Sequence, residues 1–174
     1  MRFVVLCLFL ALTLSTSAFA QKNQFPFQAQ VLNSAPDFIA TALSGNSYKL
    51  SNLKGKVVVL NFWSIKCPAC ETETADLNRL VDDYKSKDVI FLAFAHDAQP
   101  KVQKFLKSNP FKYEIFPQSL QQMMTSYGRP IGNGFFDLPF PMHVVINKQG
   151  VIVVNELGTK GVNAVRRKLS ELTK

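Results

Sequence analysis

The sequence predicts an α/β protein in which a central mixed β-sheet is flanked by helices and carries an extra N-terminal β-hairpin. Two continuous apolar runs, Val57–Trp63 and Val89–Ala95, are typical of strands that are buried on both faces. Apolar residues recur at helical spacing over residues 70–84, which predicts a helix between these strands. Residues 143–146 and 151–157 flank a polar turn and predict a β-hairpin. Strands that alternate with helices indicate this fold class.

The other elements of the first two thirds follow in chain order. Gly45 and its polar neighbours lie in the middle of residues 43–50, which predicts the N-terminal hairpin. Pro100 suits the first turn of a helix, and Val102 with the apolar residues three and four places further on forms its inner face. Residues 111–116 predict a short strand.

Turn and cap residues delimit the rest of the chain. A third helix is expected over residues 119–127, because Gly128 follows it as a stop signal. Glycine and proline residues then predict a loop over residues 130–141. Asn163 is expected to cap a last helix, whose apolar residues keep helical spacing up to Leu172.

Residues 1–20 have the pattern of a signal peptide. A positive residue precedes a long apolar stretch, and a small-residue cleavage site ends at Ala20. An uncleaved N-terminal membrane anchor is the alternative for this segment. Residues 21–33 are expected to form a flexible lead-in, and residues 34–174 a single domain. We therefore expect an exported protein, in the periplasm or an equivalent space.

The formal net charge is +8, and the lysines and arginines are scattered along the chain. This distribution favours a solvated basic surface over a nucleic-acid site, because no basic stripe is interleaved with aromatic residues. We expect a monomer that binds no nucleic acid and uses no cofactor or metal.

Cys67 and Cys70 are the only cysteines after the signal segment, and they follow directly on the strand Val57–Trp63. A disulfide that closes such a short loop adds little chain-entropy stabilisation, so the pair indicates redox chemistry rather than a structural staple. A helix N-terminus stabilises an anion, which favours a thiolate at Cys67, and Lys66 adds a positive charge beside it. Pro68 fits the first helical position. Cys70, one turn into the helix, is expected to be buried and to attack a mixed disulfide formed at Cys67.

Three separated segments carry a further pattern. Residues 35–38 read Ala-Pro-Asp-Phe, residues 50–63 precede Cys67-x-x-Cys70, and residues 141–150 begin with Pro-Met-His. In this order and spacing they resemble the TlpA-like, or ResA-like, branch of the thioredoxin superfamily. The resemblance covers most of the chain after residue 33 and implies a thioredoxin-like fold and an exported thiol–disulfide oxidoreductase.

The resemblance assigns roles to individual residues. It implies that Cys67 is the nucleophile and Cys70 the resolving thiol. Pro141 would be a cis-proline packed beside the disulfide. Phe140 would lend its backbone to an incoming client strand, with Trp63 also among the substrate-binding residues.

Other positions bear on proton transfer and redox poise. Glu73 occupies the place of a glutamate that is thought to handle protons in ResA-like proteins, although a carboxylate is also favoured in the first turn of any helix. The chain departs from the family pattern at Lys66, which replaces a tryptophan, and at Ala69, which replaces a proline. Asn61 stands where cytoplasmic thioredoxins have a buried aspartate.

The leading interpretation is that the protein reduces disulfides in client proteins, such as those of cytochrome c maturation. A thiol donor at the membrane would then reduce the protein again. Oxidation of clients is the opposite direction of the same chemistry. One alternative is a peroxiredoxin, although residues 64–67 lack the motif that precedes a peroxidatic cysteine. Another is a copper chaperone, in which His143 or His96 would join the two thiolates.

Overall fold

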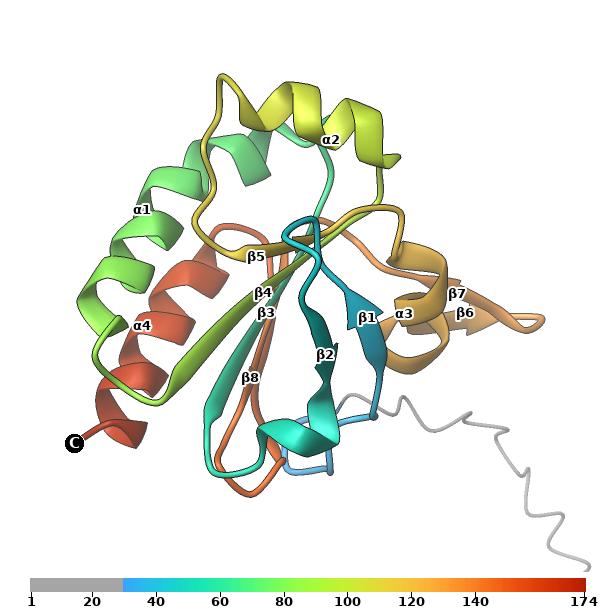
Figure 1. Ribbon diagram of the computed structural model, residues 1–174. Helices are drawn as coiled ribbons and strands as arrows, with labels where there is room; N and C mark the ends of the chain where they lie inside the picture. Colours follow the sequence, from blue (N-terminus) through green and yellow to red (C-terminus); the bar gives the residue numbers. More distant parts are fainter. Residues whose placement is uncertain (1–29) are drawn as a thin grey trace, which may run out of the picture.

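The computed structural model describes residues 30–174, which form a five-stranded mixed sheet with the strand order β5-β4-β3-β8-β9 (Figure 1). Strands β3, β4 and β5 are parallel to one another, whereas β8 is antiparallel to β3 and β9 is antiparallel to β8. The expected signal peptide, residues 1–20, lies outside the described residues. The strands are β3 (Val57–Trp63), β4 (Val89–Ala95), β5 (Glu114–Phe116), β8 (Met142–Ile146) and β9 (Ile152–Leu157).

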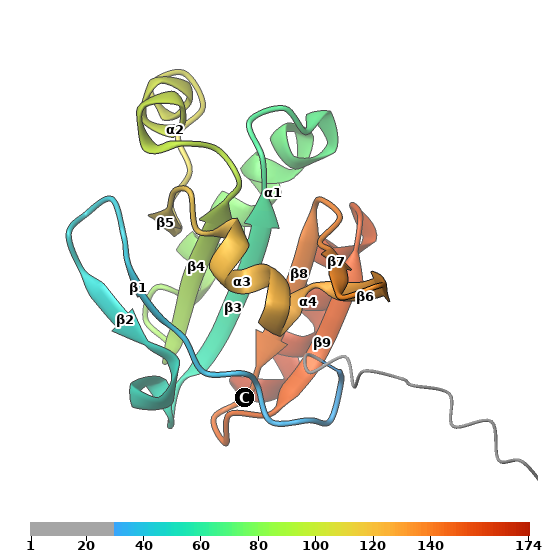
Figure 2. The ribbon, with the colours of Figure 1, turned by 90° about the vertical axis from the view of Figure 1, so that its right-hand side faces the viewer.

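Helices cover both faces of the sheet. Helices α1 (Pro68–Tyr84) and α4 (Lys160–Leu172) lie on one face, and α2 (Gln99–Leu106) packs against the same core. Helix α3 (Leu120–Tyr127) lies on the other face, on the opposite side of the sheet from α4 in Figure 2. A short 3-10 helix, Leu50–Leu53, leads into β3. This arrangement confirms the predicted thioredoxin-like architecture of a mixed sheet between helices.

The extra N-terminal hairpin is also confirmed. It consists of β1 (Ile39–Thr41) and β2 (Ser47–Lys49), so its first strand begins before the expected residue 43. The hairpin lies on the same side of the sheet as α3, and Tyr48 packs edge-on against Phe116. It therefore helps to bury the sheet face that α3 alone is too short to cover.

The central strand β3 is buried along its whole length, as its continuous apolar run predicts. Val57 and Val59 face α1 and α4, whereas Val58 and Leu60 face α3. Burying one such aliphatic side chain contributes about 1.5–3 kcal/mol to stability. Because β3 and β4 are parallel, the loops that follow them meet at one edge of the sheet, where a site can be assembled from both.

The prediction of a loop over residues 130–141 was wrong in its first half. Strands β6 (Arg129–Gly132) and β7 (Phe135–Asp137) form a separate two-stranded ribbon. At its tip Asn133 and Gly134 have φ values of 50° and 78°. An Asn-Gly pair with positive φ at both residues is a preferred turn for a two-residue hairpin, and this signal outweighed the neighbouring prolines.

The folded region begins earlier than the expected boundary at residue 34. The Leu32 backbone N–H donates to the Ile152 carbonyl, and the Ile152 N–H donates to the Asn33 carbonyl. The end of the expected lead-in is thus paired with the start of β9. No helix within residues 30–174 is long and apolar enough to cross a membrane.

Asn163 was expected to cap the last helix, but α4 begins at Lys160, with Thr159 in the capping position. Gly161 therefore lies inside the helix, where glycine is normally unfavourable. Its position has a packing reason, because a Cβ atom there would lie 2.1 Å from Cδ2 of the buried His143. Helix α4 approaches β8 closely only because residue 161 has no side chain.

This contact can be tested with a double-mutant cycle. We expect Gly161→Ala to lower the free energy of unfolding by about 1–3 kcal/mol, because the new methyl group overpacks a filled core. In a His143→Ala background the same change should stabilise the protein by up to about 1 kcal/mol, since alanine is the better helix former. Urea unfolding of the four proteins measures both values. The same sign in both backgrounds would contradict the proposed contact.

Candidate active site

The two cysteines are joined by a disulfide at the start of α1, and their Cα atoms are 5.3 Å apart. Cys67 is the N-cap residue, and its Sγ accepts a hydrogen bond from the Cys70 backbone N–H at 3.1 Å. Pro68 occupies the first helical turn, as expected. Cys67 is partly exposed whereas Cys70 is only 4% exposed. An incoming thiol or disulfide can therefore reach Cys67 more easily than Cys70.

A buried carboxylate holds the turn that leads to Cys67. Asp97 accepts hydrogen bonds from the Ser64 hydroxyl and the Ile65 backbone N–H, both at 2.8 Å. The Ser64 oxygen in turn accepts from the Lys66 N–H at 3.2 Å. Sequence reasoning missed Asp97. The signal was available, because Asp97 follows the end of β4 and parallel strands end at the same edge of a sheet.

Pro141 lies beside the end of β3, and the Phe140–Pro141 peptide bond is cis. The register pairs Phe62 of β3 with Met142 of β8, so Pro141 is next to the point where β3 continues towards Cys67. Phe140 is half-buried and packs against the core cluster that includes Cys70. The cis peptide and its place in the fold agree with the expected geometry, while the roles of Phe140 and Pro141 in client binding stay predictions.

Three polar side chains from β3, α1 and β8 are buried together. Glu73 is 4% exposed and His143 is fully buried, with His143 Nε2 3.2 Å from Glu73 Oε1. On the other side of the imidazole, Nδ1 lies 3.3 Å from the side-chain nitrogen of Asn61. The two Glu73 oxygens accept no hydrogen bond from any described residue. The structure thus brings Glu73 together with His143, a residue for which sequence reasoning favoured simple burial in a strand.

Two aromatic residues of the same core, Trp63 and Tyr113, are also buried. Trp63 is buried against the rings of Phe105 and Phe111, so its expected contact with substrate stays a prediction. Tyr113 is buried as well. Burial, and to a lesser extent the Glu73 carboxylate, raise the pKa of Tyr113 beyond the physiological range. Its hydroxyl therefore stays protonated.

Lys66 is exposed at the end of the turn. Its expected effect on the Cys67 thiolate stays a prediction. No group of three or more His, Cys, Asp and Glu side chains that could hold a metal occurs in residues 30–174.

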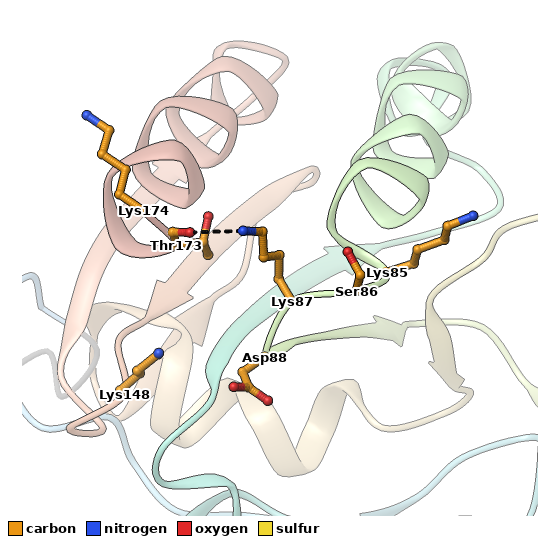
Figure 3. Close-up of a pocket in the computed structure, with 7 residues that line it drawn as sticks. All are labelled: Lys85, Ser86, Lys87, Asp88, Lys148, Thr173 and Lys174. Carbon is orange, nitrogen blue, oxygen red and sulfur yellow. Dashed lines mark hydrogen bonds between the residues drawn. The ribbon is translucent and has the colours of Figure 1, made fainter.

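Figure 3 shows a basic pocket of about 360 Å³. It is lined by the turn between α1 and β4, by Lys148 and by the C-terminal residues, so it is at the opposite edge of the sheet from Cys67. The Lys87 ammonium donates to the Thr173 carbonyl at 3.4 Å, near the end of α4. A lysine near a helix C-terminus is favoured by the helix dipole, which applies to Lys85 after α1 and to Lys174 after α4.

The fold and the geometry of the site agree with comparisons to known proteins. Residues 31–155 match the AhpC/TSA family. The chain belongs to the AhpC/TSA family. The thiol-disulfide oxidoreductase ResA of a Bacillus cereus strain is 30% identical over 171 residues, which are 98% of this chain and 92% of that protein. ResA of Geobacillus kaustophilus is 31% identical over 177 residues, 99% of this chain and 94% of that protein.

A solved structure supports the fold separately. The crystal structure of a protein assigned as thiol:disulfide interchange protein DsbE from Chlorobium tepidum has a TM-score of 0.70 and 24% identity. The match covers 82% of this chain and 97% of that one. Within the AhpC/TSA family the chain therefore stands with the ResA-like proteins, as its sequence motifs imply, and it is a thiol–disulfide oxidoreductase.

The hydrogen bonds of Asp97 give a prediction for this member of the AhpC/TSA family. Asp97→Ala leaves the Ser64 hydroxyl and the Ile65 N–H without their acceptor. Loss of a partner for a buried polar group costs about 1–3 kcal/mol, so we expect a decrease of this size in the free energy of unfolding. Ser64→Ala is the matched control, since it removes one donor and leaves Asp97 bound to Ile65. Equal, negligible effects of both changes in urea unfolding would show that the turn does not depend on Asp97.

Proposed function

We propose that this protein reduces disulfide bonds in exported client proteins, with Cys67 as the nucleophile and Cys70 as the resolving thiol. The unequal exposure of the two cysteines is the observation that carries the proposal. Cys67 also lies at the N-terminus of α1, where backbone N–H groups and the helix dipole stabilise a thiolate. The residue that is easier to reach is thus also the one that the fold prepares to attack.

The proposed reaction has two exchange steps. The Cys67 thiolate attacks one sulfur of a client disulfide, and the other client sulfur leaves as a thiolate. Cys70 then loses its proton and attacks Cys67 Sγ, which breaks the bond between Cys67 and the client and releases the second client thiolate. The client gains two electrons, and the Cys67–Cys70 disulfide forms. The two thiolates of the client take up protons, one of which comes from Cys70.

The surroundings of the disulfide fit these steps. Phe140 and Cys67 are both half-buried at the edge of the same core cluster, and Pro141 follows Phe140 through a cis peptide bond. We assign to them, together with Trp63, the binding of the client. Lys66 would favour the Cys67 thiolate. Glu73 has two oxygens without hydrogen-bond donors and lies three residues after Cys70 on α1, so it can accept the proton that Cys70 loses.

Export determines the rest of the cycle. Residues 1–20 have the pattern of a signal peptide, and we place the mature protein in the periplasm or an equivalent space. This space is oxidising, so the disulfide must be reduced again by a dithiol donor, which we place at the membrane. Apoproteins of c-type cytochromes are the clients that we propose, because their cysteines must be reduced before haem attachment. The protein would act as a monomer.

The assignment of the two thiols is tested by trapping. Cys70→Ser should accumulate a mixed disulfide between Cys67 and a client, because no second thiol is left to release it. Cys67→Ser should neither trap a client nor reduce one. Non-reducing electrophoresis and mass spectrometry of the adduct identify the bonded cysteine. An adduct through Cys70 in the Cys67→Ser protein, with none in the other, would reverse the roles.

The direction of exchange is tested by the reduction potential. Thioredoxin-type reductants lie near about −270 mV and the oxidant DsbA near about −120 mV. We expect a value closer to the first, measured by equilibration in dithiothreitol or glutathione buffers. A value near the second would make the protein an oxidant of its clients. Thiol-dependent consumption of hydrogen peroxide, measured in parallel, would instead support the peroxiredoxin alternative.

A further inference from the structure

We propose that His143 is a positioning residue that presents its Nε2–H group to buried Glu73, and that Asn61 selects the imidazole tautomer required for this. The inference rests on the proposed function, because it concerns the step in which Cys70 loses its proton. Three side chains from three elements meet here: Asn61 from β3, His143 from β8 and Glu73 from α1. All three are at most 4% exposed.

The tautomer follows from the partner of each ring nitrogen. The Asn61 side-chain nitrogen, 3.3 Å from His143 Nδ1, can only donate a hydrogen bond. Nδ1 must then accept, so the proton of the neutral imidazole is on Nε2. Nε2 is the atom that lies 3.2 Å from Glu73 Oε1. A neutral histidine in this tautomer presents an N–H group to the carboxylate without adding a buried positive charge.

This tautomer places a hydrogen-bond donor, the His143 Nε2–H group, near the buried Glu73 carboxylate. A buried carboxylate is unfavourable without a hydrogen-bond donor. No backbone or side-chain group within residues 30–174 donates a hydrogen bond to either Glu73 oxygen. His143 Nε2 is in range but not yet aligned, and such contacts often tighten only when the reaction proceeds. Glu73 therefore keeps an acceptor site for the Cys70 proton.

The imidazole is fixed in place and has few charged neighbours. Gly161 of α4 lies against its Cδ2 atom, so the ring cannot swing towards the helix. Glu156 is its partner on β9 but is exposed to solvent. Tyr113, near Glu73, stays protonated and uncharged. The other buried titratable side chains near the redox pair are Tyr113, Cys70 and Asp97, and Asp97 is bound to the turn at Ser64 and Ile65.

The proposed proton transfer is balanced. When Cys70 resolves a mixed disulfide, its S–H bond breaks and an O–H bond forms on Glu73. The Cys70 sulfur then bonds to Cys67 Sγ as the second thiolate leaves. Glu73 passes its proton to that thiolate or to water and returns to the carboxylate, which again faces the Nε2–H of His143. His143 keeps its own proton throughout.

The reaction of the reduced protein with dithionitrobenzoate separates the two exchange steps. Attack by Cys67 releases the first thionitrobenzoate, and attack by Cys70 on the mixed disulfide releases the second. His143→Phe keeps a ring but removes both nitrogens. We expect the second phase to slow about tenfold, as the loss of a hydrogen bond to a charged group implies, with the first phase unchanged. Its pH dependence should also move to higher pH, since Cys70 would then lose its proton to solvent.

The control is His96→Phe, the same change at the only other histidine of the chain, which is exposed at the end of β4. Both phases should stay as in the unchanged protein. An unaltered rate and pH profile of the second phase in folded His143→Phe would overturn the inference. Loss of the first phase in Cys67→Ser tests the proposed function by itself, so the two can fail separately.

A measurement on the unsubstituted protein keeps the inference testable if His143→Phe does not fold. Long-range ¹H–¹⁵N NMR spectra distinguish the two neutral imidazole tautomers and the imidazolium, and His96→Phe assigns the remaining signals to His143. We expect His143 with a proton on Nε2 and none on Nδ1 at neutral pH. A proton on Nδ1, alone or with one on Nε2, would overturn the inference.

Discussion

A single buried carboxylate determines where the catalytic helix begins. Asp97, at the end of β4, binds the turn that connects β3 to α1 and so makes Cys67 the N-cap residue. Each residue of an α-helix is rotated by about 100° from the one before. If α1 began one residue earlier or later, Cys70 and Glu73 would turn away from the sheet by that angle. The burial of Cys70 and the position of Glu73 thus depend on this turn.

The core of the protein contains a cluster of polar side chains among mostly apolar ones. Most of the core on both faces of the sheet is apolar, but the side chains of Asn61, Glu73 and His143 are polar and lack full hydrogen bonding. Buried polar groups of this kind lower stability, and they are expected where a function requires them. One of them, Glu73, is on the same helix as Cys70, one turn further on.

Much of the fold could be predicted because its strongest signals are local. The strands β3 and β4 were predicted with their observed bounds, since continuous apolar runs mark strands that are covered on both faces. The redox pair was also readable, because the spacing of Cys67 and Cys70 is a property of one helical turn. The contact of His143 with Glu73 depends instead on the register of β8 against β3 and on the packing of α1. No local pattern contains that information, and the same holds for the capping position of α4.

Residue 161 has no side chain, and for this reason the residue types at positions 143 and 161 depend on each other. Gly161 is required only because an imidazole fills the space in front of it. In a relative with a smaller residue at position 143, residue 161 would be free to become alanine and gain helix stability. The histidine and the glycine are therefore expected to be inherited as a pair, and their joint occurrence would mark those relatives that share this buried arrangement.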